Sequence, residues 1–135
     1  MSQRPGTMRL IDALQYRLPL AGVVSILHRA SGALLFVLMP FIIWMFDTSL
    51  SSEISHSQFV ALFIGGVGFL PGWFFKLVVL GLIWAYLQHF IAGVRHLWMD
   101  ATHSVSKEFG HRSAVATLAA SGVLTLVLGF KLLFF

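Results

Sequence analysis

The chain has 135 residues, of which 58% are hydrophobic and only 10% are charged, whereas a soluble domain carries about a quarter charged residues. This composition excludes an ordinary water-soluble domain and predicts a single all-α domain embedded in a lipid bilayer. The absence of cysteine excludes disulfides, thiolate metal sites and iron–sulfur ligation by this chain. The net charge of +4 is small, and no nucleic-acid partner is expected.

The first predicted membrane span covers residues 20–46, which are apolar except for Ser25, His28 and Arg29 near the start. About 20 residues at 1.5 Å each cross the hydrocarbon core, so this length is sufficient. Pro40 is expected to kink the span, which neighbouring helices can accommodate.

The middle of the chain is harder to assign. A polar loop, residues 47–57, follows the first span, and residues 59–72 are apolar but rich in glycine, with a proline near the end. Because these residues form helices poorly, we expect an interfacial or partly re-entrant segment here. The second span is predicted over residues 73–98 and the third over residues 113–130, with a polar loop between them.

The positions of lysine and arginine predict the orientation of the chain. Two basic groups flank the spans, one before the first span and one around the loop between the second and third: Arg4, Arg9 and Arg17, and Arg95, Lys107 and Arg112. With three spans these groups share one side of the membrane, which the positive-inside rule makes the cytoplasmic side. We therefore expect a cytoplasmic N-terminus and, over residues 1–19, a retained surface arm with no cleavable signal.

Four residues near the start of the first span share one face of the predicted helix: Ser25, His28, Arg29 and Gly32. A serine hydroxyl can donate a hydrogen bond to a buried carbonyl, and an arginine can bind a carboxylate or stabilise a developing oxyanion. The stripe is therefore a candidate ligand site. The alternative is that His28 and Arg29 reach the polar interface while Ser25 bonds to its own helix.

A second polar stripe, at steps of four, three and four, ends the second span: His89, Gly93, His96 and Asp100. Ionisable groups inside a span are costly and indicate a function. A histidine with a glycine one turn away offers a metal-binding nitrogen beside a gap that could hold a flat macrocycle. The alternatives are a hydrogen bond between helices for His89 and an interfacial ion-pair network of Arg95, His96 and Asp100.

If His89 ligates a haem iron, its second axial ligand must come from another helix. His96 lies about 10 Å away along the same face, so the two cannot bind opposite sides of one iron. His28 is expected at the cytoplasmic end of its span, too shallow to face His89, and the other histidines are expected in loops or on the far side. A bis-histidine haem would therefore require a partner membrane subunit.

Together the two stripes resemble motifs of a known family, the cytochrome b556 subunits of succinate dehydrogenase, the respiratory complex II. The segment from Ser25 to Gly32 (SILHRASG) resembles the S-x-x-H-R-x-[ST]-G motif. The segment from His89 to Asp100 (HFIAGVRHLWMD) matches every position of the H-x-x-x-G-[hydrophobic]-R-H-[hydrophobic]-x-x-D motif. The three-span layout also fits, so the resemblance covers nearly the whole chain.

The resemblance implies an anchor subunit without the flavin chemistry, in a bundle with a second membrane-anchor subunit of the bacterial inner membrane. It implies one haem b with His89 as an axial ligand and a histidine of the second anchor subunit as the other. Ser25 and Arg29 would help form the ubiquinone site beside an iron–sulfur subunit, which receives electrons from a flavoprotein subunit in the tricarboxylic acid cycle. Four residues would lie near the haem or its propionates: His28, Gly93, Arg95 and His96.

Three alternatives remain open from the sequence: a small transporter or channel subunit, a haem-free anchor in which His89 only hydrogen-bonds, and a fumarate-reductase-type anchor. The spans carry no Asp or Glu deep in the bilayer to relay protons, which counts against a transporter. Haem content distinguishes the first two alternatives from a cytochrome, and quinone preference distinguishes the third.

Overall fold

The computed structural model describes residues 11 and 16–134, so Arg4 and Arg9 of the predicted arm lie outside it. The described part is helical: α2 (Leu20–Val37), α3 (Met39–Leu50), α4 (Glu53–Gly65), α5 (Gly72–Thr102) and α6 (Lys107–Phe134). Three of these, α2, α5 and α6, are long and apolar enough to cross a membrane. The expected all-α fold with three candidate spans is confirmed.

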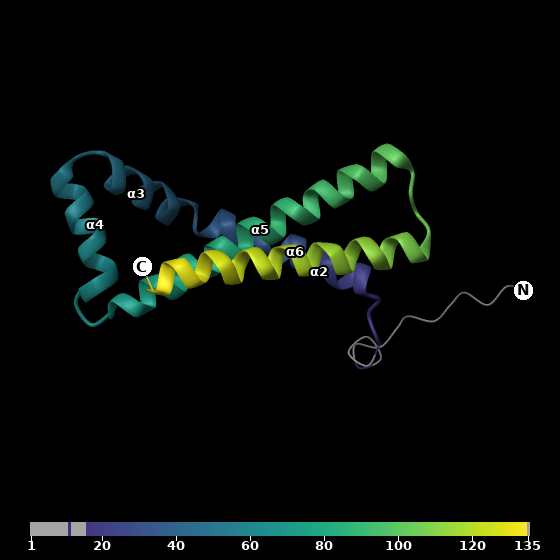
Figure 1. Ribbon diagram of the computed structural model, residues 1–135, viewed down its shortest axis with the longest axis horizontal. Coiled ribbons are helices and arrows are strands. Elements are labelled where there is room, and N and C mark those ends of the chain that lie inside the picture. Colours follow the sequence, from purple (N-terminus) through teal and green to yellow (C-terminus); the bar gives the residue numbers. More distant parts are fainter. Residues whose placement is uncertain (1–10, 12–15, 135) are drawn as a thin grey trace, which may run out of the picture.

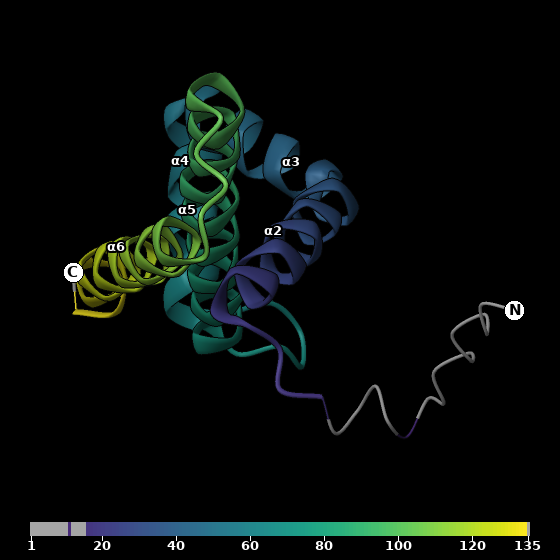
Figure 2. The same cartoon turned by 90° about the vertical axis from the view of Figure 1, so that its right-hand side faces the viewer.

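The central helix of the bundle is α5, which packs against both α2 and α6. The view along the bundle shows α2 and α6 on different sides of α5 (Figure 2). The start of α2 and the α5–α6 connection lie at one end of the molecule, whereas α3, α4 and the C-terminus lie at the other (Figure 1). We call the first of these ends the α5–α6 end and the second the α3–α4 end.

The first predicted span is broken at Leu38, between α2 and α3. Pro40 lies in the first turn of α3, where it has no N–H to donate to the preceding turn. Hydrogen bonds still cross the break, because the Leu38 N–H donates to the Leu34 carbonyl and the Leu38 carbonyl accepts from Ile42, both at 3.0 Å. After the break α3 turns away from the direction of α2 (Figure 2).

The polar loop expected over residues 47–57 is wrong in extent, because α3 continues to Leu50 and α4 begins at Glu53. The serines explain the difference. The Ser52 hydroxyl accepts the N–H of Ser55 at 3.1 Å, and the Ser55 hydroxyl accepts the N–H of Ser52 at 3.0 Å. This reciprocal cap satisfies the first free N–H groups of α4, so polar residues typical of a loop begin a helix here.

The glycine-rich segment is helical in its first half, since α4 continues through residues 59–65. Its glycines act mainly after that point. Gly66 and Gly68 have positive φ angles of 78° and 59°, and a Cβ on Gly66 would collide with the Leu70 carbonyl. The glycines therefore end α4 and form the turn into α5, and the interfacial depth of the segment stays a prediction.

The second polar loop is also shorter than expected, because α5 ends at Thr102 and α6 begins at Lys107. His103 ends α5 in the left-handed conformation, with φ 51°. The Ser106 hydroxyl accepts the N–H of Phe109 at 3.2 Å, which caps the start of α6. With 31 and 28 residues, both helices exceed the about 20 that cross the hydrocarbon core and extend beyond it.

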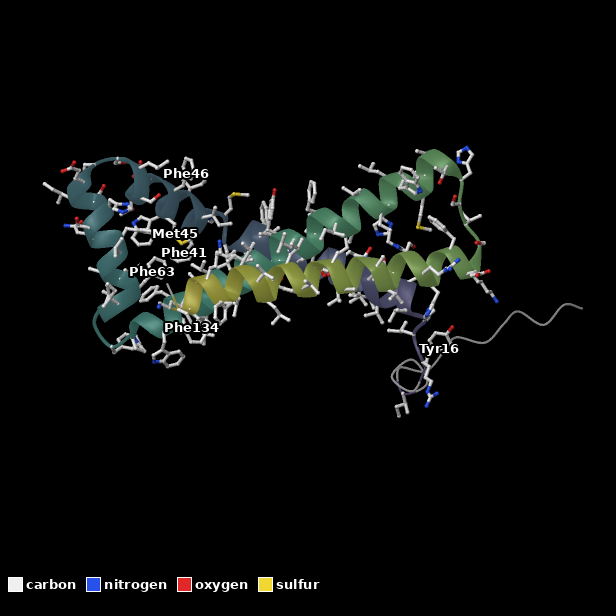
Figure 3. The ribbon with its side chains drawn as sticks, viewed as in Figure 1. Tyr16, Phe41, Met45, Phe46, Phe63 and Phe134 are labelled. Carbon is white, nitrogen blue, oxygen red and sulfur yellow. The ribbon has the colours of Figure 1, made fainter. Side chains whose placement is uncertain are left out.

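Aromatic side chains lie at both ends of the bundle. Phe41, Phe46 and Phe63 gather at the α3–α4 end with Phe134 nearby, whereas Tyr16 lies at the opposite end (Figure 3). Aromatic residues are enriched at the two interfaces between a membrane and water. The arrangement therefore agrees with a bundle that crosses the bilayer along its long axis.

Candidate functional site

The two polar stripes meet across the α2–α5 interface. The ring of His28 stacks on the ring of His89, with centroids 4.2 Å apart and planes inclined by 9°. His96 lies next to them, with its ring centroid 5.2 Å from that of His28. The expectation that His28 is too shallow to face His89 is therefore wrong.

The reason is the position of α2 along α5. Leu20 and Ala21 line the same cavity as Arg95 and Met99, so the start of α2 lies level with the last turns of α5. His28 lies about two turns, or some 10 Å, further along α2 from this level, and His89 lies about as far from it along α5. The two histidines are therefore at the same depth. The depth of a residue within its own span did not reveal this offset.

Hydrogen bonding fixes the tautomer of His89. Its Nδ1 lies 3.0 Å from the backbone carbonyl oxygen of His28 and 3.4 Å from the hydroxyl of Ser31. A carbonyl oxygen only accepts, so Nδ1 of the neutral ring carries the proton and Nε2 keeps its lone pair. Metal-ligating histidines almost always donate their other N–H in this way. Nε2 of His89 is therefore prepared to bind a metal.

Gly32 allows this close approach of α2 and α5. A Cβ at Gly32 would lie 2.8 Å from Cε1 of His89, so any larger residue would displace the ring or the helix. The glycine singled out beside His89, Gly93, is less crowded, because a Cβ there would lie 3.6 Å from Nε2 of His28. Nε2 of His28 therefore lies nearest to Gly93, and the macrocycle expected beside this glycine stays a prediction.

Ser25 and Arg29 lie one turn apart near the start of α2. Nη2 of Arg29 donates to the Ser25 hydroxyl at 3.3 Å, and the guanidinium is exposed. The two residues therefore act as one polar group on the outer surface of the chain. A ligand oxygen beside them could accept hydrogen bonds from both.

Arg95 faces α6 and not the histidines. Its Nε donates to the Ser113 hydroxyl at 2.9 Å and its Nη2 to the Gly110 carbonyl at 3.2 Å, and the residue is buried. Six residues separate it from His89, which places it roughly 120° around the helix. A shared motif therefore divides between two faces of α5.

Asp100 is exposed on the last turns of α5. Among the residues that the structure describes, the ion pair recorded joins Arg112 to Glu108 at 3.7 Å and leaves Asp100 out. The interfacial ion-pair network expected around Asp100 is therefore not formed within the described chain.

Two buried polar residues beside the histidines were missed in the sequence. Ser31 is fully buried and donates its hydroxyl to the His28 carbonyl at 2.9 Å. Gln88 is fully buried about 100° around α5 from His89, where its Oε1 accepts from the Ser121 hydroxyl of α6 at 2.7 Å. Both are polar residues within apolar spans and next to the polar stripes in sequence. This position could have identified them as candidate site residues.

The histidine pair does not by itself form a multidentate metal site. Within residues 11 and 16–134, no three His, Asp or Glu side chains are grouped to hold an ion. The stacked rings of His28 and His89 direct their lone pairs within nearly parallel planes, so these do not converge on one metal. The arrangement offers one oriented imidazole nitrogen to a metal whose other ligands come from elsewhere.

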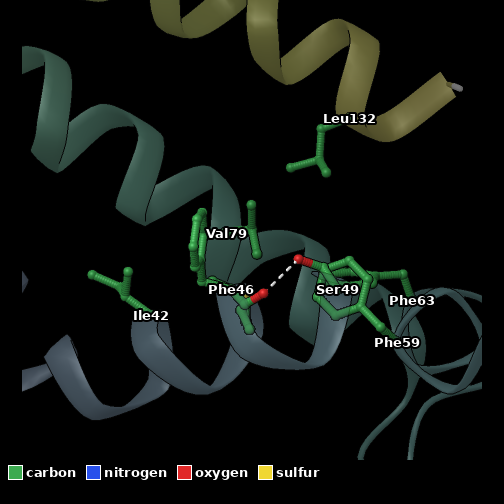
Figure 4. Close-up of a pocket in the computed structure, with 8 residues that line it drawn as sticks. Ile42, Phe46, Ser49, Phe59, Phe63, Val79 and Leu132 are labelled. Carbon is green, nitrogen blue, oxygen red and sulfur yellow. Dashed lines mark hydrogen bonds between the residues drawn. The ribbon is translucent and has the colours of Figure 1, made fainter. Parts of the chain in front are cut away.

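A groove at the α3–α4 end is apolar and offers little chemistry. It encloses 390 Å³ between α3, α4, α5 and the end of α6 (Figure 4). The polar side chain in its lining is Ser49, whose hydroxyl donates to the Phe46 carbonyl at 2.9 Å. The chemical site therefore lies at His28 and His89 and not at this groove, which neither histidine lines.

Known proteins are similar in sequence to this chain over most of its length. The family model described as the succinate dehydrogenase/fumarate reductase transmembrane subunit matches residues 3–128. The succinate dehydrogenase cytochrome b556 subunit of Paracoccus denitrificans is 32% identical over 118 residues, 85% of this chain and 85% of that protein. The subunit of the same name from Coxiella burnetii is 30% identical over 119 residues, 88% of this chain and 90% of that one. The chain belongs to the family of succinate dehydrogenase/fumarate reductase transmembrane subunits.

Proposed function

We propose that this chain is a membrane anchor of a succinate:ubiquinone oxidoreductase, which binds haem b jointly with a second anchor subunit and forms part of the ubiquinone site. The observation that carries the proposal is the hydrogen bond from Nδ1 of His89 to the His28 carbonyl, which leaves Nε2 free to ligate iron. When bound, haem b would supply one-electron transfer, with His89 as the residue of this chain that would hold it.

The residues around His89 fit this role. The His28 carbonyl and Ser31 hold the proton of Nδ1, and Gly32 lets the ring lie against α2. Stacking covers a face of the His89 ring but not its edge, where the lone pair of Nε2 points. His28 lies against His89, and His96 lies against His28. We assign these two histidines to the haem propionates, whereas Arg95 is bonded to α6.

In this proposal the other anchor subunit would supply the second histidine that holds the haem. The stacking of His28 on His89 keeps their lone pairs from meeting at one iron. His96 lies two turns from His89 on the same face of α5. Neither neighbour can therefore complete the pair within this chain.

Ser25 and Arg29 form the chain's part of the quinone site. The Ser25 hydroxyl donates a hydrogen bond to a quinone carbonyl, and the charge of Arg29 stabilises negative charge that develops on that oxygen. Electrons reach this site from an iron–sulfur subunit, which a flavoprotein subunit supplies. This requires the α5–α6 end to face the cytoplasm, which is the side that the positive-inside rule assigns to it in a bacterial inner membrane.

The haem is tested by a reduced-minus-oxidised visible spectrum of the detergent-extracted complex. We compare wild type with His89→Ala and with His56→Ala, which removes an exposed histidine at the α3–α4 end. A b-type signal that is lost in His89→Ala and kept in His56→Ala supports the proposal. An assembled wild-type complex without haem would leave a haem-free anchor or a transport subunit.

The quinone site is tested by Arg29→Leu. We expect a loss of roughly 100-fold in quinone reduction, because a fixed charge that stabilises developing negative charge contributes about this much. Succinate oxidation by a soluble artificial acceptor should stay near the wild-type rate. Arg112→Leu, which removes an exposed arginine of α6, is the control. Unchanged quinone reduction in Arg29→Leu would remove Arg29 from the mechanism.

A fumarate-reductase-type anchor is the second candidate, because the matching family covers both kinds of enzyme. The names of the two curated relatives favour succinate dehydrogenase. Activity of the complex with ubiquinone against a low-potential menaquinone distinguishes the two.

A further inference from the structure

A cavity lined by basic residues lies at the α5–α6 end of the bundle, and neither His28 nor His89 lines it. It encloses 630 Å³ between the start of α2, the last turns of α5 and the first turn of α6. Four of its lining side chains are basic: Arg17, Arg95, Lys107 and His111. None of the lining residues in the described part of the chain is acidic, so this basic cavity is suited to an anion.

Arg95 is a fixed part of this wall. The side chain is 8% exposed, and two of its nitrogens are held by Ser113 and Gly110 of α6. A guanidinium has five N–H donors, so these two bonds orient the group without using all of it. A buried cation without a carboxylate partner is costly, and an anion in the cavity would reduce that cost.

The start of α6 adds to the positive potential. Ser106 and Lys107 line the cavity, and the first N–H groups of the 28-residue helix α6 lie at this point. A helix N-terminus favours an anion through its free N–H groups and its dipole. The nearest acid in sequence, Glu108, is not part of the lining and pairs with Arg112 instead.

The remaining lining is apolar and defines what kind of anion fits. Leu20, Ala21, Met99 and Val105 face the same space as the basic groups. Because α5 and α6 are longer than the hydrocarbon core requires, their ends lie at the level of the lipid headgroups. An anion with an apolar tail would contact both the basic and the apolar lining residues, whereas free phosphate would contact only the basic ones.

We propose that the basic cavity binds the phosphodiester headgroup of an anionic phospholipid, with the start of an acyl chain against Leu20 and Met99. Basic pockets between membrane helices are suited to such headgroups. The bound lipid would contact α2, α5 and α6 together at this end of the bundle. This site depends on neither the haem nor the quinone.

The test uses the whole detergent-extracted complex, reconstituted with phosphatidylglycerol and phosphatidylcholine in equal amounts. Native mass spectrometry measures which lipids stay bound. The variant Arg17→Ala/Lys107→Ala removes two exposed basic groups of the cavity and leaves the buried Arg95 in place. Arg112→Ala/Lys131→Ala removes the same charge outside the cavity and is the matched control.

Wild type and the control should retain phosphatidylglycerol in preference to phosphatidylcholine. The cavity variant should bind phosphatidylglycerol roughly 30-fold more weakly, because each basic group near a membrane surface contributes about a factor of five. Equal retention in the cavity variant, or equal loss in the control, would overturn the proposal. Displacement of the lipid by millimolar inorganic phosphate would also overturn it, since the site would then prefer the free ion.

If the cavity variant fails to assemble, a second measurement on the wild-type complex tests the same site. Wild-type complex is irradiated with a phosphatidylglycerol that carries a photoreactive group in its headgroup, and the labelled peptides are sequenced. Labels within residues 16–21 and 95–111 support the site. Labels spread evenly over the lipid-facing helices, or confined to the α3–α4 end, contradict it.

Discussion

The ring of His89 is oriented by α2 and not by its own helix. Its Nδ1 faces the His28 carbonyl and the Ser31 hydroxyl, and its Cε1 edge lies against Gly32. All of these contacts come from a little more than one turn of α2. A substitution in that turn can therefore change the orientation of the His89 ring while the histidine itself is intact.

Gly32→Ala is the smallest change that tests this arrangement. The added Cβ would lie 2.8 Å from Cε1 of His89, so we expect the ring to move and haem content per complex to fall. Gly81→Ala on α5 is the control, because a Cβ there meets nothing within 4 Å. That control should keep its haem and gain about 0.5–1 kcal/mol in unfolding free energy, as helical glycine-to-alanine changes do. Normal haem in Gly32→Ala would contradict the tight approach.

Residues on one helix were predictable, because the 3.6-residue repeat fixes which side chains share a face. Ser25 with Arg29, and His89 with His96, follow from that repeat alone. The stacking of His28 on His89 was not predictable, since it depends on the offset between two helices. The direction of Arg95 was misjudged for a simpler reason, because a motif in sequence was treated as a single site in space.

The helix α5 packs against two other helices, α2 and α6, through different faces. One face presents His89 and His96 to α2, and another presents Gln88, Ala92 and Arg95 to α6. Small residues on α6, including Gly110 and Ala114, let the two backbones approach. The rotation of α5 about its axis is therefore fixed from both sides.

The Gln88–Ser121 pair allows a test of the α5–α6 interface. Nε2 of Gln88 is buried without a partner in the described structure, so Gln88→Leu removes an unpaired group, and Ser121 keeps its bond to the Leu118 carbonyl. We expect this change to be neutral or stabilising. Ser121→Ala leaves the whole Gln88 amide unpaired and should cost about 1–3 kcal/mol. Denaturant unfolding of the complex measures both, and a larger loss in Gln88→Leu would contradict this account.

The existence of the long helices was predictable from runs of apolar residues, but their ends were not. Ser52 and Ser55 have the composition of a loop and yet cap a helix, because their hydroxyls replace missing backbone partners. The glycines before α5 predicted a poorly helical segment over residues 59–72. Instead α4 continues to Gly65, and Gly66 and Gly68 form the turn that follows it. Capping depends on local geometry that composition does not specify.

Over the residues that the structure describes, three long helices make an odd number of candidate membrane crossings. The helices α3 and α4 have 12 and 13 residues, fewer than the about 20 that a crossing needs. They form a hairpin at one end and so add no span (Figure 1). The start of α2 and the end of α6 are therefore expected on opposite sides of the membrane.

Cysteine labelling tests this topology directly, because the natural chain has no cysteine. His103→Cys places a thiol in the α5–α6 connection and Ser52→Cys places one between α3 and α4. An impermeant thiol reagent should label His103→Cys only from the cytoplasmic side and Ser52→Cys only from the opposite side. Labelling of both from one side would contradict the three-span arrangement.

The central claim is that this chain provides one axial ligand, His89, and that the second comes from another subunit. The most direct measurement is the electron paramagnetic resonance spectrum of the oxidised complex, for wild type and for His89→Gly with and without added imidazole. We expect a low-spin haem in wild type, a high-spin or absent haem in the variant, and recovery of the low-spin signal with imidazole. A low-spin haem that persists in the assembled variant without imidazole would contradict this claim.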